Sequence, residues 1–178
     1  MFLLSGKEKL APKPSAGMLL RGFAGGMLSI FILLLLSGYA HQPWIMAPFG
    51  ASCILLHAVP QSPLAQPRNV IFGHAVFAAI GLSVALYAPI NAFSIAIAVG
   101  LAICCMQFFR CVHPPAGANP LVILLTAPAV HYDWGFLVFP VLSGAVSLVA
   151  VAYVLNNWRS AKPWPEYGLA LWHSKMKE

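Results

Sequence analysis

Two short strings of proline, glycine and small polar residues are the parts of this sequence best suited to bind a ligand. The first comprises Pro48, Phe49, Gly50, Ala51 and Ser52, and the second comprises His113, Pro114, Pro115, Ala116, Gly117, Ala118 and Asn119. Each string precedes a short apolar run, and proline is tolerated in the first turn of a helix, where its missing N–H is not needed. We therefore predict that each string opens a short helix, whose free N–H groups and positive dipole end attract an anion.

The residue types in these strings suit a small anion. Gly50 and Gly117 let a ligand approach the backbone, while Ser52 and Asn119 supply neutral hydrogen-bond donors. If the two helices have opposite orientations, their starts meet near the middle of the membrane and form an anion-selective constriction. The alternative is that the two starts only satisfy each other's hydrogen bonds.

Three histidines are candidates for coupling a proton to anion movement. His113 directly precedes the second string and titrates near neutral pH in its ordinary state. The alternative for His113 is a neutral ring that caps its neighbours. His74 lies inside an apolar run, where a polar group usually faces the protein interior, and His57 is similarly placed. A single interhelical hydrogen bond would satisfy either of them.

The charge distribution places the middle of the chain in a bilayer. The sequence of 178 residues is 60% hydrophobic and 8% charged, against about 25% charged residues in soluble domains. Between Gly22 and Trp158 the charged residues are Arg68, Arg110 and Asp133. This pattern excludes a soluble enzyme, and the clustering of the remaining basic residues at the two ends argues against nucleic-acid binding. The tail also carries several aromatic residues among basic ones.

The lengths of the apolar runs predict an all-α membrane protein with six segments. Four long spans are expected at 17–40, 69–88, 91–109 and 135–158, and two short helices at 47–60 and 114–127. They form a transmembrane domain over 17–158, between a cytoplasmic amino-terminal segment (1–16) and a cytoplasmic tail (159–178) that lies on the membrane surface.

Positive charge favours six crossings over four. If both short helices cross, Arg68, Arg110 and both termini face the cytoplasm and Asp133 faces outward, as the positive-inside rule requires. If both short helices re-enter on the same side, four crossings remain and the two arginines move outside. Six crossings also give the two halves opposite orientation, and we expect a 3+3 inverted repeat in a multi-pass protein of the bacterial inner membrane. Arg68 and Arg110 either attract anions at a cytoplasmic mouth or anchor the topology.

No enzyme, cofactor or metal site is expected. The sequence has no nucleotide-binding motif, its four cysteines form no paired motif, and Cys111-x-His113 is too little for a metal. A lone His113 without a nearby carboxylate is also a poor catalytic group. Gly22 and Gly26 permit close helix approach, within one chain or between chains, and we expect a homo-oligomer.

The second string, together with Pro48–Ser52 and Ser62–Asn69, resembles the recurrent motifs of the HPP family, which is named for its His-Pro-Pro. The resemblance extends from Gly17 to about Trp158. It implies an integral membrane protein, usually described with four transmembrane helices, and members from plastids and cyanobacteria are associated with nitrite transport. The expected function is therefore transport of a small inorganic anion, with nitrite the expected ion, by a channel-like or proton-coupled route. The alternative is a structural or assembly subunit without transport activity.

Overall fold

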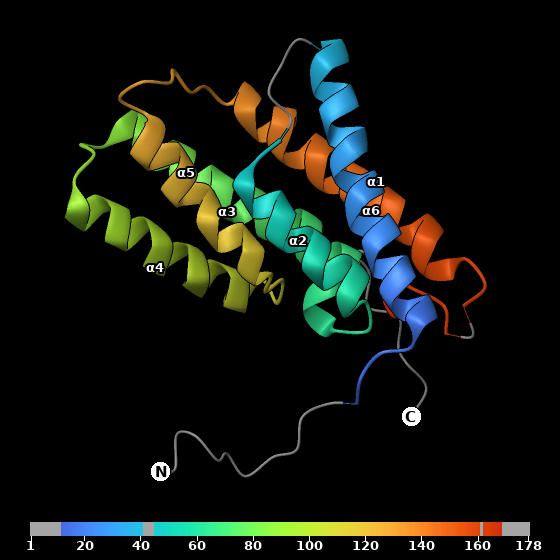
Figure 1. Cartoon of the computed structure of the whole chain (residues 1–178). Helices are drawn as coiled ribbons and strands as arrows, with labels where there is room; N and C mark the ends of the chain where they lie inside the picture. The colour runs from blue at the N-terminus through green and yellow to red at the C-terminus, as the bar shows by residue number, and fades with distance from the viewer. Residues whose placement is uncertain (1–11, 41–44, 161, 169–178) are drawn as a thin grey trace, which may run out of the picture.

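The computed structural model describes residues 12–40, 45–160 and 162–168, and all regular secondary structure in this part of the chain is helical (Figure 1). The α-helices are α1 (Ala16–Ala40), α2 (Ala47–Ala58), α3 (Pro67–Tyr87), α4 (Ala92–Phe108), α5 (Asn119–Thr126) and α6 (Ser143–Asn157). The shorter elements are the 3-10 turns η1 (Pro63–Ala65) and η2 (Pro114–Ala118) and the π-helical η3 (Leu137–Leu142). The prediction of an all-helical fold with six main helices is confirmed. The outermost parts of the predicted end segments, 1–11 and 169–178, lie outside the described residues.

Local chemistry explains where the helices begin. Proline occupies the first turn of α2, α3 and α5, where its missing N–H removes no hydrogen bond. Before α4, the Asn91 side chain accepts the N–H groups of Phe93 and Ser94 at 3.0 Å, and the Ser94 hydroxyl accepts the Asn91 N–H at 3.0 Å. This reciprocal cap satisfies free N–H groups and gives α4 a sharp start after the short turn from α3.

The described residues include three helical stretches long and apolar enough to cross a membrane, namely Ala16–Tyr39, Pro67–Tyr87 and Leu137–Asn157. They correspond to three of the four predicted long spans. The fourth forms α4, an apolar helix of 17 residues, which is about 26 Å long. Together with α2, it belongs to the shorter apolar helices.

Two predicted segments differ from single regular helices because of proline. In the segment predicted at 135–158, Phe139 has a non-helical backbone (φ −126°, ψ 117°) before Pro140, so the chain passes through η3 before α6 begins. A proline inside a helix removes one backbone hydrogen bond and displaces the preceding turn. In the segment predicted at 114–127, Pro114 and Pro115 start a 3-10 turn, and α5 follows with only eight residues.

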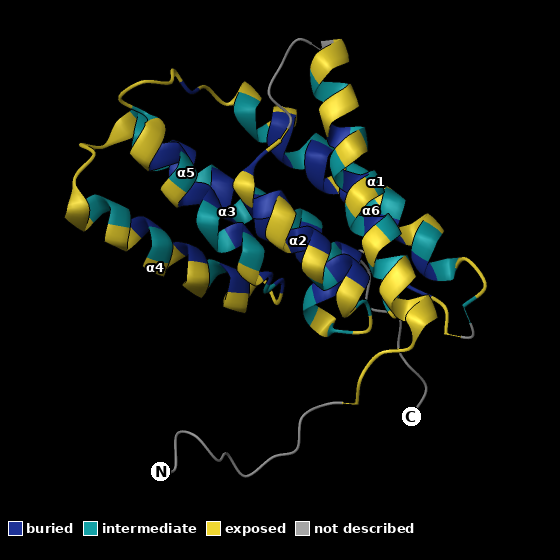
Figure 2. Ribbon diagram, in the orientation of Figure 1, coloured by how far each residue is buried: buried dark blue, intermediate teal, exposed yellow. Residues whose placement is uncertain are grey.

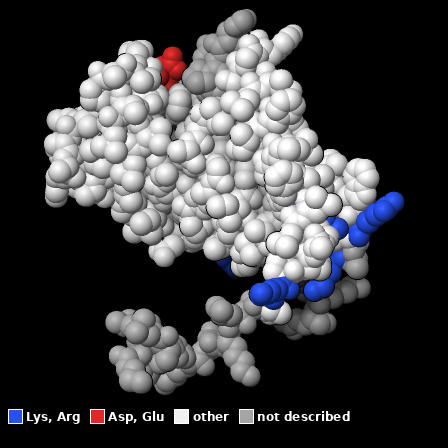
Figure 3. Space-filling view, in the orientation of Figure 1, with Lys and Arg blue, Asp and Glu red and all other residues white. Residues whose placement is uncertain are grey.

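Successive helices run between the same two ends of the molecule. At one end, an Arg21 N–H donates to the Trp158 carbonyl (3.1 Å), and an Arg68 N–H donates to the Phe109 carbonyl (2.8 Å). The same end therefore holds the start of α1, the start of α3, and the ends of α4 and α6. In Figure 3 the visible Lys and Arg side chains gather toward this end, and acidic atoms appear at the opposite one. There, the Trp134 indole N–H donates to the Tyr87 hydroxyl at 3.1 Å.

The main contacts among the six α-helices follow a regular pattern. α1 packs on α2 and α6, and α4 packs on α5 and α3. α2 also packs on α6, as α5 packs on α3, and α3 and α6 contact each other. Exchanging the first three helices with the last three therefore leaves this pattern unchanged.

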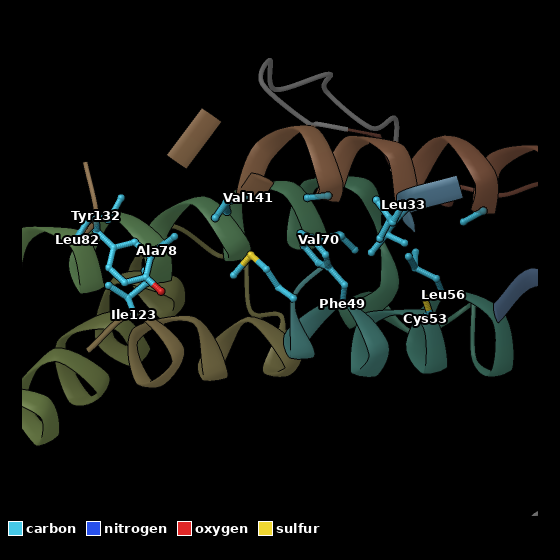
Figure 4. Close-up of a cluster of buried hydrophobic side chains, with 14 of the residues drawn as sticks. Leu33, Phe49, Cys53, Leu56, Val70, Ala78, Leu82, Ile123, Tyr132 and Val141 are labelled. Atoms are coloured by element: carbon cyan, nitrogen blue, oxygen red, sulfur yellow. The ribbon is translucent and has the colours of Figure 1, made fainter. Parts of the chain in front are cut away.

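The core lies between α2, α3 and α6, with α1 and α5 contributing from either side. It includes Leu33, Phe49, Leu56 and Val70, all fully buried (Figure 4). Leu148 of α6 belongs to the same core and is also fully buried. The outer faces of α1 and α4 are largely exposed (Figure 2) and carry large apolar side chains, as expected of surfaces that face lipid.

Gly25 and Gly26 are neighbours on α1 with opposite surroundings, which gives a testable prediction. A Cβ at Gly25 would overlap the His57 ring of α2, whereas a Cβ at Gly26 would meet no atom within 4 Å. Gly25→Ala is therefore expected to lower the free energy of unfolding by about 1–3 kcal/mol, the usual effect of overpacking. Thermal unfolding of the detergent-solubilised protein, followed by tryptophan fluorescence, measures the effect.

Gly26→Ala is the matched control. It is expected to leave the midpoint of thermal unfolding unchanged or to raise it slightly, because alanine has a higher helix propensity than glycine. Equal midpoints for the two variants would contradict the close α1–α2 contact at Gly25.

Candidate functional site

Ser52 lies at the centre of a buried polar cluster formed by segments far apart in the sequence. Its hydroxyl oxygen, on α2, is 2.8 Å from Nε2 of His74 on α3 and 2.8 Å from Nε2 of His113, which precedes η2. All three side chains are fully buried. The two predicted short-helix openings therefore meet directly, through Ser52 from one and His113 from the other.

The Leu64 carbonyl determines the proton position on neutral His113. Nδ1 of His113 is 2.8 Å from this carbonyl oxygen, which can only accept a hydrogen bond, so Nδ1 carries the proton and donates. Nε2 of the neutral ring is then bare. It accepts the hydrogen bond that the Ser52 hydroxyl donates.

Asn119 determines the proton position on His74 in the same way. The Asn119 amide nitrogen is 3.1 Å from the His74 carbonyl oxygen and 3.1 Å from Nδ1 of the His74 ring. One amide hydrogen serves the carbonyl and the other serves Nδ1, which must therefore be bare. Neutral His74 carries its proton on Nε2 and donates it to the Ser52 oxygen.

The hydrogen bonds of the cluster consequently all point one way. They run from Asn119 to His74, from His74 to Ser52, from Ser52 to His113, and from His113 to the Leu64 carbonyl. One end of this chain is an amide and the other a backbone carbonyl, and neither group gains or loses a proton at ordinary pH. The arrangement therefore holds the two rings in single tautomers.

Phe49 closes the cluster on the α6 side. Its ring is fully buried and meets the His74 ring edge-on, with centroids 5.1 Å apart. Gly144 of α6 gives the ring room, because a Cβ there would overlap the Phe49 ring. The same crossing of α2, α3 and α6 thus positions Phe49 and His74.

The structure brings together five of the residues singled out from the sequence: Phe49, Ser52, His74, His113 and Asn119. The other pathway residues surround them at different depths. Pro48 and Ala116 are buried, Pro115, Gly117 and Ala118 are half-buried, and Gly50, Ala51 and Pro114 are exposed.

The remaining predicted residues lie apart from the cluster. His57 is nearly buried, and its Nε2 is 2.9 Å from the Ser29 hydroxyl of α1. Arg68 binds the Phe109 carbonyl and lies over the Phe72 ring, 5.7 Å from its centroid. Arg110 is exposed, with a left-handed backbone (φ 55°).

Two apolar grooves reach the short-helix openings from outside. One, of about 350 Å³, lies between α1 and α2 and is lined in part by Gly26, Gly50 and Cys53. The other, of about 300 Å³, lies between α3, α4 and η2 and is lined in part by Pro114 and Gly117. The glycine of each opening therefore lies at the wall of a groove.

Sequence reasoning missed the carboxy-terminal segment that packs against the start of α3. The Tyr167 hydroxyl contacts the Pro63 carbonyl and the Asn69 side-chain oxygen, both at 3.0 Å, and the Glu166 N–H donates to the Gln66 side-chain oxygen at 2.9 Å. Burial raises the pKa of the Tyr167 phenol above its ordinary value. Asn69 also donates to the Val112 carbonyl at 2.8 Å. No pattern in the sequence connects these positions, which are up to about 100 residues apart.

Within the described part of the chain, no three His, Cys, Asp or Glu side chains are grouped so that they could hold a metal ion. The four cysteines are free thiols. The polar atoms of the cluster are imidazole, hydroxyl and amide groups, which can donate to an anion or exchange partners with one another.

In the described part of the chain, six helices enclose a buried polar cluster, three stretches are long and apolar enough to span, and α1 and α4 expose apolar faces. These features define a multi-pass membrane protein. Residues 11–165 match the family described as HPP, transmembrane region, and the chain belongs to this family. The family resemblance of the short motifs is thereby confirmed.

Two relatives come from Dictyostelium discoideum, and their names say only that they are transmembrane proteins. One is 33% identical over 174 residues, which cover 93% of this chain and 61% of the relative. The other is 36% identical over 129 residues, which cover 70% of this chain and 41% of the relative. The chain thus spans less than two thirds of the length of these relatives. No solved structure matches it.

Proposed function

We propose that the protein transports a small inorganic anion across the membrane, and that nitrite is the ion. The observation that carries this proposal is the convergence of the two short-helix openings on buried neutral donors. Ser52 and Asn119 carry hydroxyl and amide hydrogens, and the backbone openings beside them have the positive end of a helix dipole. Neutral donors and the positive end of a helix dipole both stabilise an anion.

In this proposal the two halves of the chain, each of three helices, form an inverted repeat around the pathway. The exchange symmetry of the helix contacts supports this, because α2 and η2 with α5 occupy equivalent places in the two halves. The opposite directions of the two halves also support it. In this proposal both short helices cross, giving six crossings with both termini in the cytoplasm of a bacterial cell.

Movement of an anion requires the two openings to separate. In the described conformation the Ser52 hydroxyl and the Asn119 amide hydrogens are all engaged within the protein, and the Phe49 ring is packed beside them. The pathway we propose is therefore closed at the Ser52–His113 contact. The grooves at Gly50 and Gly117 are the routes along which an opening can extend.

Arg68 and Arg110 belong to the same proposal as attractors of anions. They lie near the ends of α3 and α4 that meet at the basic end of the molecule. Cationic groups at a mouth raise the local anion concentration. We also propose that the protein is not an enzyme and that it forms a homo-oligomer.

The competing function is a structural or assembly subunit. The closed hydrogen-bond chain favours it, since every hydrogen described in that chain already has a partner and the two grooves are mainly apolar. A structural subunit would keep this chain intact at all times and would conduct no anion.

Flux into proteoliposomes tests the proposal. Reconstituted protein is expected to increase the entry of nitrite above the rate in protein-free liposomes, with nitrate, formate and chloride as competing ions. Asn119→Leu, which removes both amide hydrogens, is expected to reduce the flux at least about tenfold, as loss of one anion contact of about 1.5–3 kcal/mol would.

Ser83→Ala is the matched control, since the Ser83 hydroxyl binds only the Ala79 carbonyl of its own helix, at 2.8 Å. Each variant is first checked for monodispersity and for a cooperative unfolding transition. Absence of anion flux from correctly folded wild-type protein would leave the structural subunit as the better explanation.

A further inference from the structure

The three candidate histidines differ in whether they can hold an additional proton. A buried imidazolium needs an acceptor at each of its two N–H groups, because an unpaired buried donor is strongly unfavourable. The partners of each ring can therefore be examined one at a time.

His74 has no place for a second proton. Its Nδ1 faces the Asn119 amide nitrogen at 3.1 Å, so protonation would set two donors against each other. Turning the amide over would remove the bond that the same nitrogen donates to the His74 carbonyl, also 3.1 Å long. His74 is therefore held neutral by Asn119.

His57 is also unsuited to a second proton. Its Nε2 has the Ser29 hydroxyl as a partner, but its Nδ1 is buried without a hydrogen-bond partner. The ring lies against Gly25 of α1, and an N–H at Nδ1 would remain unpaired.

His113 can hold a second proton while keeping every hydrogen bond. Nδ1 already donates to the Leu64 carbonyl. A proton added to the Nε2 lone pair is donated to the Ser52 oxygen, which accepts at its second lone pair while still accepting from His74. The Ser52 hydroxyl hydrogen then turns to the Pro48 carbonyl, which lies 3.2 Å away in the first turn of α2. No heavy atom needs to move.

Among the described residues, none that surrounds His113 supplies a compensating negative charge. Its polar and ring neighbours on other elements are the Ser52 hydroxyl of α2, the His74 ring of α3, the Leu64 carbonyl of η1 and the Met106 sulfur of α4. The segment that carries His113 also holds Cys111, which lies near Arg68, and the exposed Arg110. The described carboxylates, Asp133 and Glu166, are both exposed and make none of these contacts. A buried charge without a partner is unfavourable, so protonation of His113 requires an anion beside it.

We propose that His113 is the proton-binding residue of an electroneutral proton–anion cotransport, in which the proton binds at Nε2 only together with the anion at the opening formed by Pro114–Asn119. This inference rests on the proposed anion transport. The groove of about 300 Å³ lined by Pro114 and Gly117 places an apolar cavity next to this opening. On the far side of the membrane the anion leaves and the proton leaves Nε2. The Ser52 hydroxyl hydrogen then turns back from the Pro48 carbonyl to Nε2 of His113.

Nitrite uptake into proteoliposomes with separate control of pH and membrane potential tests the coupling. The protein-dependent initial rate, after subtraction of protein-free liposomes, is expected to rise several-fold when the outside is made more acidic. Changing the potential with potassium and valinomycin is expected to leave the rate unchanged. A second measurement uses a pH dye in weak buffer, where nitrite added to the solubilised protein is expected to cause proton uptake.

Two variants at His113 assign the proton to this residue. His113→Asn retains an amide N–H at the position of Nδ1, and His113→Gln retains an oxygen at the position of Nε2, so each preserves one of the two bonds. In both variants, the nitrite entry that remains at equal pH is expected not to be accelerated by a pH gradient, and nitrite-induced proton uptake is expected to disappear. His57→Gln is the control, and it is expected to keep both the acceleration by the pH gradient and the proton uptake.

The outcomes separate the inference from the function on which it rests. Wild-type nitrite flux that ignores the pH gradient, or that follows the membrane potential, would overturn proton coupling while leaving anion transport in place. Coupling retained in a folded His113 variant would move the proton to another residue. If no anion is transported at all, the transport function itself fails, and the cotransport inference fails with it.

Discussion

Replacing Ser52 by alanine is expected to be among the most damaging single changes in the molecule. The hydroxyl accepts from His74 and donates to His113 at 2.8 Å each, so its removal leaves one buried donor and one buried acceptor without a partner. Each such group is unfavourable by about 1–3 kcal/mol. The unfolding midpoint of the detergent-solubilised protein, measured by tryptophan fluorescence, is expected to fall accordingly.

Ser147→Ala provides the comparison for this variant. Ser147 is also a helical serine, but its hydroxyl donates only to the Ser143 carbonyl of its own helix, at 2.8 Å. That carbonyl keeps its place in the helix when the hydroxyl is removed, so the midpoint is expected to change little. A Ser52→Ala variant as stable as Ser147→Ala would mean that the two histidines do not depend on the hydroxyl.

The positions of the helices follow from features that are local in the sequence. The length of an apolar run and the proline or capping residue before it predict a helix without knowledge of its neighbours, as at Pro67 and Asn91. The same reasoning does not predict the irregular parts of the last two segments, because Pro114 and Pro115 begin a 3-10 turn and Pro140 interrupts a run that is otherwise long enough for one helix. The backbone of Phe139, directly before Pro140, is not helical. In α2 the proline lies in the first turn, and the helix continues after it.

The candidate site could be predicted as residues but not as a network. Ser52, His113 and Asn119 are visible in the sequence because they stand in two similar strings, and His74 because it is polar within an apolar run. Their connection depends on where α2 and α5 cross α3, which no local pattern encodes. The Leu64 carbonyl, which determines the tautomer of His113, carries no sequence signal because every residue has a carbonyl.

Trp164→Ala is the second change for which a large effect is expected. Aromatic residues among basic ones predict a tail on the membrane surface, yet the Trp164 side chain is only 2% exposed and belongs to the main apolar core. Asn157 holds the segment in place, since its side chain accepts the backbone N–H of Trp164 at 2.9 Å and donates to the backbone carbonyl of Trp164 at 2.6 Å. Loss of a buried tryptophan side chain is unfavourable by about 3–5 kcal/mol.

Trp158→Ala distinguishes burial of the tail from a general effect of losing a tryptophan. Trp158 follows the end of α6 and is 64% exposed, so its removal is expected to change the unfolding midpoint far less than that of Trp164. Circular dichroism follows both variants, because each loses one fluorophore. If the two midpoints fell equally, the tail would contribute no more than an interfacial contact. A much larger fall for Trp164→Ala would make the segment 162–168 part of the folded domain, and its contacts with Gln66 and Asn69 would then help to hold the start of α3.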